Sequence, residues 1–248
     1  MGEKSPIVSV IVPAYNEEKL LGACLRSLTA QKCSIAYEII VVDNNSTDKT
    51  AAIARSFQQV KVLYESTPNV VAARQKGLEA ARGEIVACAD SDSRYPTNWV
   101  TTIYDLFKKN LAVVGIAGPA EPETNPYWAY FLLRVSFQVI ELIYRLTGRV
   151  VYAGAFNFAF RKNVFLKIGG YRTYLEHGGD EFDVLNRLQK IGKVMFAPQL
   201  TMTLSTRCYR IGFMKWLFVE TLYYYVLNYF LASIFKRQII HPKLVRNI

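Results

Sequence analysis

Short apolar runs alternate with longer amphipathic segments through the first half of the chain. The runs lie at residues 8–12, 38–42, 60–64, 85–89 and 113–118. Nearly continuous apolar runs are typical of parallel strands buried on both faces. Between them, apolar residues recur every three or four positions, which indicates helices with one buried face. This alternation predicts an α/β fold with right-handed βαβ connections and a mostly parallel central sheet flanked by helices.

The fourth run ends at two acids one residue apart, Asp90-Ser91-Asp92. Ligands of open α/β sheets bind at the carboxyl ends of the strands. Two carboxylates at such an end are costly unless they bind something cationic. A divalent metal that also contacts a diphosphate fits this requirement, because hard cations prefer oxygen ligands and share them with phosphates. The alternative is a polar loop that only caps the strand.

Composition and charge narrow the class of protein. Hydrophobic residues make up 51% of the 248 residues, which excludes general disorder. Residues 1–124 hold 13 Lys and Arg against 14 Asp and Glu, a balance of −1, whereas residues 125–248 hold 17 against 6, a balance of +11. A basic, aromatic half suits an anionic membrane surface. Nucleic-acid binding is disfavoured because the chain has no recognition motif or dense basic stripe.

Other motifs are missing. Neither the dinucleotide-binding pattern G-x-G-x-x-G nor the P-loop pattern follows the first strand. The four cysteines are scattered without a C-x-x-C, which favours reduced, mostly buried thiols in a cytosolic protein. The N-terminus has no long apolar segment of the kind that marks a signal peptide.

Four ordered segments resemble the nucleotide-sugar glycosyltransferases of family 2, which have the GT-A fold. They are residues 8–18, 39–50, 72–99 and 154–192. The resemblance implies an enzyme that transfers a sugar from a nucleoside diphosphate sugar, with inversion at the anomeric carbon and with Mg²⁺ or Mn²⁺ as cofactor. A nucleotidylyltransferase is disfavoured because the Gly-rich loop with Arg is missing after Val12.

The resemblance also implies roles for the first two segments. Pro13 and Tyr15 are expected near the nucleoside base, Glu17 near the ribose, and Asp43 at a hydrogen bond to the base. The family often has Asp-Asp-Gly-Ser where this chain has Asp43-Asn44-Asn45-Ser46. This departure leaves both uracil and guanine open.

The donor site is expected to include further residues. Arg74, in the family's Ala-Arg pattern, is expected to reach the base or the Asp-x-Asp loop. Asp92 is expected to ligate the metal, and Asp90 to contact the ribose or the water shell of the metal, with Ser91 in the same loop. Gly154 permits close approach of the backbone to the donor sugar. Either Arg207 or Arg210 can clamp the diphosphate, since guanidinium suits phosphate geometry, or both can face lipid headgroups.

Inversion needs one general base that deprotonates the acceptor hydroxyl. The family pattern Glu-Asp is reversed here to Asp180-Glu181. Glu181 aligns with the base but is one methylene longer, so Asp180 stays a rival, and both acids can also simply favour a helix N-terminus. Asp183 is expected to pair with Arg187 at i+4. His177 is a candidate for metal or acceptor contact, with a solvated loop histidine as the alternative.

The basic half contains two aromatic segments that are expected to form amphipathic helices, one near its start and one near its end. Residues 128–146 and 216–235 are almost wholly apolar or aromatic. The charges spaced along residues 128–146 favour an interfacial or core helix over a spanning one. The four tyrosines, Glu220 and Asn228 favour an interfacial position for residues 216–235, although their length could barely span a bilayer. Packing on the catalytic domain or on a second subunit is the alternative for residues 216–235. We divide the chain into a nucleotide-sugar-binding half (1–124), an acceptor and catalytic half of the same domain (125–210), and a membrane-associating helix with a basic tail (211–248).

These observations lead to one leading hypothesis and one alternative. The first is a metal-dependent inverting glycosyltransferase that acts on a glycan or lipid-linked acceptor in envelope polysaccharide or glycolipid synthesis. It is expected in the cytoplasm, peripheral on the inner face of the cell membrane. The alternative is a non-catalytic nucleotide-sugar-binding or membrane scaffold protein, for which the reversed Asp180-Glu181 pair leaves room.

Overall fold

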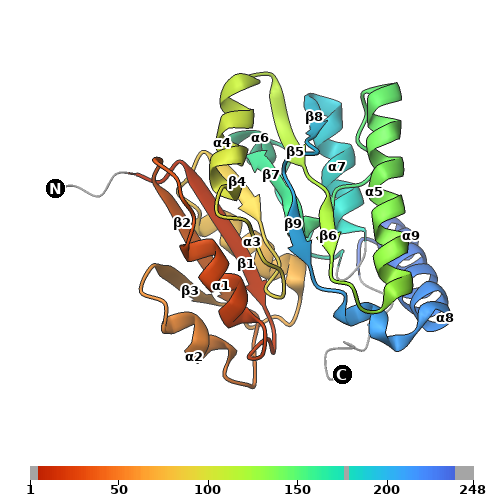
Figure 1. The fold of residues 1–248 in the computed structure, drawn as a ribbon, viewed down its shortest axis with the longest axis horizontal. Coiled ribbons are helices and arrows are strands. Elements are labelled where there is room, and N and C mark those ends of the chain that lie inside the picture. Colours follow the sequence, from red (N-terminus) through yellow and green to blue (C-terminus); the bar gives the residue numbers. More distant parts are fainter. Residues whose placement is uncertain (1–4, 176–178, 238–248) are drawn as a thin grey trace.

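A computed structural model describes residues 5–175 and 179–237. Seven strands form the central sheet in the order β3-β2-β1-β4-β7-β5-β8 (Figure 1). Their bounds are β1 Val8–Ala14, β2 Tyr37–Asp43, β3 Val60–Tyr64, β4 Ile85–Cys88, β5 Val113–Ala117, β7 Phe158–Arg161 and β8 Lys193–Phe196. All neighbouring pairs are parallel except those of β7, which is antiparallel to both β4 and β5. The predicted mostly parallel sheet is therefore confirmed.

Helices cover both faces of this sheet, which explains the continuous apolar runs. Side chains alternate between the two faces along each strand. Val10 packs in the core beneath α1 and α4, whereas its neighbour Ile11 packs in the core beneath α3 and α7. The bounds of these helices are α1 Leu21–Thr29, α3 Val70–Ala80, α4 Trp99–Lys109 and α7 Asp180–Ile191, and the short helices α2 Thr50–Arg55 and α6 Lys162–Lys167 complete the layers.

A small second sheet joins the two halves of the chain. It pairs β6 (Ala120–Pro122) with β9 (Met202–Leu204) in parallel. An isolated antiparallel bridge also links Arg94 to Thr203, with backbone hydrogen bonds of 3.0 and 2.8 Å. The loop that follows Asp92 and the segment that leads to Arg207 are therefore fixed to each other through the backbone.

The C-terminal helices lie beside a long helix from the middle of the chain. Helix α5 spans Tyr127–Thr147, and a short 3₁₀ turn, η1, spans Ala155–Asn157. After a 3₁₀ turn at Arg207–Ile211 (η2), the chain continues through α8 (Phe213–Lys215), a π-helical stretch at Trp216–Leu227 (η3) and α9 (Asn228–Phe235). Figure 1 shows α5, α8 and α9 together at one edge of the molecule, where the ring of Trp128 contacts the rings of Phe213 and Trp216. Within residues 5–175 and 179–237, no helix combines the length and the apolar character that crossing a bilayer requires.

Candidate active site

The acidic loops predicted from the sequence meet at the carboxyl ends of β1, β2 and β4. The register pairs Ala14 with Asp43, and Ala89 hydrogen-bonds to the Ile11 carbonyl at 3.0 Å. The segments that follow these three strands are thus neighbours, as expected for parallel strands.

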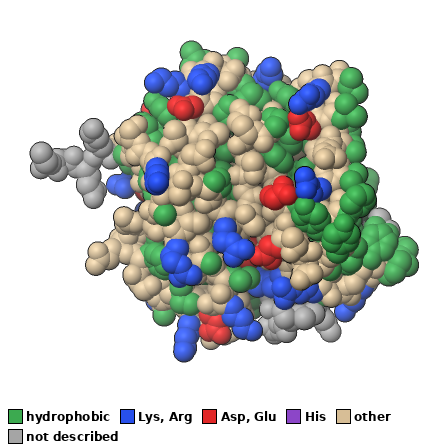
Figure 2. Space-filling model, in the orientation of Figure 1, with side chains coloured by type: hydrophobic (Ala, Val, Ile, Leu, Met, Phe, Trp, Pro, Cys, Tyr) green, Lys and Arg blue, Asp and Glu red, His purple; other side chains and the backbone are tan. Residues whose placement is uncertain are grey.

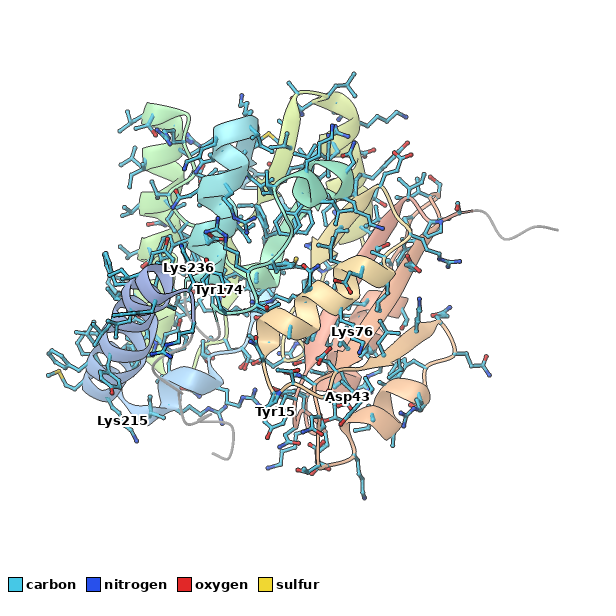
Figure 3. All side chains as sticks on the ribbon, turned by 180° about the vertical axis from the view of Figure 1, so that it is seen from behind. Tyr15, Asp43, Lys76, Tyr174, Lys215 and Lys236 are labelled. Atoms are coloured by element: carbon cyan, nitrogen blue, oxygen red, sulfur yellow. The ribbon has the colours of Figure 1, made fainter. Side chains whose placement is uncertain are left out.

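The residues expected around the nucleoside lie at the ends of β1 and β2. Figure 3 shows Tyr15 and Asp43 at the same end of the sheet. Asp43 is buried, and its Oδ1 accepts a hydrogen bond of 3.3 Å from the backbone of Ser46. The side chain of Asn16 links the two loops, because its Oδ1 accepts a 2.9 Å hydrogen bond from the backbone N–H of Thr47. These contacts order the two loops that follow β1 and β2.

Tyr95 holds the backbone of the Asp-x-Asp loop, and the two carboxylates of this loop are partly exposed. The phenolic oxygen of Tyr95 accepts a 2.9 Å hydrogen bond from the Asp90 N–H and donates one of 2.9 Å to the Phe156 carbonyl. Ser91 is buried, whereas the side chains of Asp90 and Asp92 are 32% and 23% exposed. Two carboxylate side chains that can act as oxygen ligands therefore lie partly exposed after the carboxyl end of β4.

Arg207 brings the end of β1 and the Asp-x-Asp loop together. Its guanidinium binds the Glu17 carboxylate through two hydrogen bonds of 2.7 and 3.1 Å. The same Nη2 lies 3.4 Å from Oδ2 of Asp92. Glu17 is only 3% exposed, so the arginine neutralises a buried charge. Of the two candidate arginines, Arg207 is the one at the acids, and Arg210 is exposed.

Arg74 connects the Asp-x-Asp loop to the acid pair at the start of α7. The inner side of α3 holds its guanidinium buried, with Nη1 2.6 Å from Oδ2 of Asp180 and Nη2 3.6 Å from Oδ1 of Asp90. Although burial disfavours the charged guanidinium, the two carboxylates raise the pKa of Arg74 well above its usual value. One cation therefore ties the Asp-x-Asp loop to the first turn of α7.

Asp180 and Glu181 occupy the first turn of α7 but have different surroundings. Asp180 is buried, and burial together with the Glu181 carboxylate raises the pKa of Asp180 to about 7, against the opposing effect of Arg74. Glu181 is partly exposed. Burial and the negative charge of Glu181 also raise the pKa of Tyr152 well above its usual value, and the Tyr152 ring packs against Phe182, the residue after Glu181, with centroids 6.1 Å apart.

The remaining acid of this helix has a structural role. Arg187 Nη2 lies 2.6 Å from Asp183 Oδ2, which confirms the expected i+4 pair, and Arg172 adds a second bond of 2.9 Å. A Cβ on Gly154 would collide with the Phe156 ring at 2.3 Å, so a glycine is required there for packing. His177 lies outside the described residues.

Sequence reasoning missed two residues that shape the site, Asn157 and Tyr152. Asn157 is fully buried, accepts a 2.8 Å hydrogen bond from the Trp99 indole and donates to the carbonyls of Pro119 and Leu200 at 2.8 and 2.7 Å. Its place in the aromatic run Phe156-Asn157-Phe158 was the available signal, since a lone amide among apolar residues needs hydrogen-bond partners when it is buried. Tyr152 gave no signal, because only the tertiary fold brings its ring to Phe182, beside Glu181.

Comparison with known proteins identifies relatives of the chain. The sequence model of the family described as Glycosyl transferase family 2 matches residues 9–169. Glycosyltransferase AglE of Haloferax volcanii is 32% identical over 189 residues, which cover 71% of this chain and 59% of AglE. The glucosyl-dolichyl phosphate glucuronosyltransferase of the same organism is 27% identical over 70% of this chain and 58% of its own length. The chain thus spans less than two thirds of these relatives.

Solved structures share the fold at low sequence identity. The mannosyltransferase PcManGT from Pyrobaculum calidifontis, in complex with GDP-Man and Mn²⁺, has a TM-score of 0.67 and 19% identity, with 97% of this chain and 67% of that one covered. TarS 1–349 from S. aureus, in complex with UDP-GlcNAc, has a TM-score of 0.63 and 19% identity over 81% of this chain and 58% of that one. The predicted GT-A-like fold is confirmed, and the chain belongs to glycosyltransferase family 2.

Proposed function

We propose that this chain is a metal-dependent inverting glycosyltransferase that uses a nucleoside diphosphate sugar and a glycan or lipid-linked acceptor. The observation that supports this most is the meeting of Glu17, Asp90, Asp92 and the Asp180-Glu181 pair around two arginines. The names of relatives support a lipid-linked acceptor, and the nucleotide sugars bound by PcManGT and TarS support the donor class.

The donor side of the site suits a nucleoside diphosphate. Pro13, Tyr15 and Asp43 are proposed to line the base, with the buried Asp43 carboxylate accepting a ring N–H. Glu17 is proposed to face the ribose and Arg207 the diphosphate, which a guanidinium recognises through paired N–H donors. Ser91 and Gly154 are proposed to border the sugar.

The acids at the carboxyl end of β4 suit a divalent metal as ligands. Asp92 and Asp90 offer hard carboxylate oxygens, and their side chains are 23% and 32% exposed. Among the described residues, no group of three or more His, Cys, Asp or Glu side chains is arranged to hold a metal alone. The remaining ligands would come from the diphosphate and water, which matches the coordination habits of Mg²⁺. When bound, the metal would neutralise charge on the departing nucleoside diphosphate.

Glu181 is the better candidate for the general base. Asp180 already accepts from Arg74 at 2.6 Å and is buried, so its oxygen has little freedom to reach an acceptor hydroxyl. Glu181 is partly exposed and one methylene longer, which gives its carboxylate more reach. Asp180 then acts as a positioning residue that keeps the first turn of α7 against the donor half.

Product formation with and without metal tests this proposal. Transfer or hydrolysis of UDP- and GDP-sugars should require Mg²⁺ or Mn²⁺, stop with EDTA, and fall by about 10²-fold or more in Asp92→Asn. Glu121→Gln, an exposed acid outside the site, serves as the control. Full turnover in EDTA, or in Asp92→Asn, would refute the metal role.

We also propose that the aromatic edge rests on an anionic membrane surface. Six apolar side chains of α5, spaced three or four residues apart, are exposed on one face: Tyr127, Phe131, Val135, Val139, Leu142 and Leu146. Figure 2 shows hydrophobic side chains gathered along this edge, and Figure 3 shows Lys215 and Lys236 on the C-terminal helices beside it. An apolar stripe next to basic residues suits anionic lipid. Flotation with anionic vesicles tests this, and a concentration-dependent dimer without flotation would favour a second copy instead.

A further inference from the structure

The Arg207 guanidinium lies between Glu17 and Asp92, the acid that is proposed to ligate the metal. Its Nη2 is shared between the two acids, at 2.7 Å from Glu17 Oε1 and 3.4 Å from Asp92 Oδ2. Glu17 is 3% exposed, so its carboxylate depends on this guanidinium for neutralisation. The contact to Asp92 is the longer and looser of the two. Arg207 is therefore bound firmly to Glu17 and loosely to Asp92.

The backbone of Arg207 is fixed, so its guanidinium adjusts by side-chain rotation. Thr206 is fully buried, and its hydroxyl donates to the Asn125 carbonyl. On the other side, the Tyr209 ring packs edge-on against Trp128 with centroids 5.7 Å apart. Strand β9 is in turn bound to the Asp-x-Asp loop through the bridge between Arg94 and Thr203. These contacts keep the guanidinium within reach of Asp92.

A divalent cation on Asp92 would lie beside this guanidinium, and like charges at that distance repel strongly. A diphosphate removes the conflict, because its oxygens bind the metal and accept hydrogen bonds from the arginine at once. Without the nucleotide, metal and Arg207 compete for Asp92. With it, both are accommodated.

We infer that Arg207 is a resident counter-ion that makes tight metal binding depend on the nucleoside diphosphate. The inference rests on the proposed function, in which Asp92 holds the metal. It assigns Arg207 a second role besides diphosphate recognition, namely suppression of metal binding to the empty site. By linkage, the metal and the nucleotide then increase each other's affinity by the same factor.

Mn²⁺ binding measured by electron paramagnetic resonance tests the inference without any turnover. The dissociation constant for Mn²⁺ is measured on the whole chain alone and with saturating UDP or GDP, and protein-free blanks correct for Mn²⁺ bound by the nucleotide. In the wild type, nucleotide should tighten Mn²⁺ binding by about tenfold or more. In Arg207→Gln, Mn²⁺ alone should bind several-fold more tightly than to the wild type, and the gain from nucleotide should shrink.

Two further variants keep the result interpretable. Arg207→Lys retains the charge without the paired donors, so it should bind Mn²⁺ alone more tightly than the wild type and less tightly than Arg207→Gln. This variant also provides the test if Arg207→Gln is unstable. Arg210→Gln, an exposed arginine three residues away, should bind Mn²⁺ like the wild type. Equal Mn²⁺ affinity of the nucleotide-free wild type, Arg207→Lys and Arg207→Gln would overturn the inference and leave the metal site intact. No Mn²⁺ binding even with nucleotide would overturn the proposed metal role as well.

Discussion

Arg74 Nη1 lies 2.6 Å from Oδ2 of Asp180, although 106 positions separate the two residues in the sequence. The pair is buried, and the same guanidinium lies 3.6 Å from Asp90. A change at Arg74 should therefore affect the donor loop and the acid pair of α7 together.

The pH dependence of activity should report this pair. Burial and the neighbouring Glu181 carboxylate raise the pKa of Asp180 to about 7, so the carboxylate that pairs with Arg74 dominates above that pH. Catalysis that depends on Asp180 to position α7 through its ion pair with Arg74 should accordingly increase as the pH rises through 7. Removing a neighbouring cation destabilises the carboxylate and raises its pKa. In Arg74→Gln, the increase in kcat/KM should therefore move to higher pH.

Arg172→Gln is the matched control for Arg74→Gln. Arg172 also bonds a carboxylate of α7, at 2.9 Å from Asp183 Oδ1, but its side chain is 43% exposed. The pH profile of kcat/KM in Arg172→Gln should match that of the wild type. An unshifted profile in Arg74→Gln would show that the arginine does not control the titration of Asp180.

Two neighbouring substitutions separate the base from its positioning partner. Glu181→Gln should lower kcat by about 10²- to 10⁴-fold, because it removes the proposed proton acceptor, while nucleotide binding persists. Asp180→Asn should have a smaller effect on kcat, since an amide can still accept from Arg74. Single-turnover transfer and nucleotide titration measure both quantities. A larger loss in Asp180→Asn than in Glu181→Gln would reverse the two roles.

The contact between Gly179 and Tyr229 joins α7 to α9. Gly179 has φ of 87°, and a Cβ there would lie 2.0 Å from the Tyr229 ring. Gly179→Ala should therefore destabilise the fold by the backbone cost of about 1–2 kcal/mol plus a steric cost. Gly148→Ala isolates the backbone cost, because Gly148 has φ of 70° with nothing within 4 Å of the added Cβ. Thermal unfolding of both variants measures the difference, and equal losses would mean that the Tyr229 contact contributes nothing.

Membrane attachment should depend on the exposed face of α5. Leu142→Glu and Leu146→Glu place charges on side chains that are 55% and 77% exposed, so they should leave folding intact and reduce flotation with anionic vesicles. Leu111→Glu is the control, since Leu111 is 81% exposed but lies between α4 and β5. Equal flotation of all three variants would exclude this face as the lipid contact.

Asn157 should be among the most sensitive positions for stability. Asn157→Leu would leave the Trp99 indole and the Pro119 and Leu200 carbonyls without their amide partner in a fully buried site. Each unsatisfied buried group costs about 1–3 kcal/mol, so a total loss above about 3 kcal/mol is expected in urea unfolding. Asn163→Ala, at an exposed position, should change stability little.

Local sequence patterns predicted the features that depend on a single segment of the chain. Continuous apolar runs mark strands covered on both faces, and polar residues directly after them mark the ligand edge, so the sheet and the places of Glu17, Asp43, Asp90 and Asp92 followed from the sequence. The i+4 pair of Asp183 and Arg187 followed from helix geometry alone. The family, too, was apparent from the order of its motifs.

Contacts between distant segments required the tertiary structure. The sequence left Arg207 and Arg210 equivalent, and only the path of β9 brings Arg207 to Glu17 and Asp92. It also left Asp180 and Glu181 as rivals, which burial and the Arg74 contact distinguish. Periodicity assigns a side chain to a face of its own helix or strand, but burial, charge partners and pKa depend on which other segments pack there. For this protein, the sequence by itself determined the sheet, its acidic edge and the family, and only the tertiary structure decided which cation faces which acid.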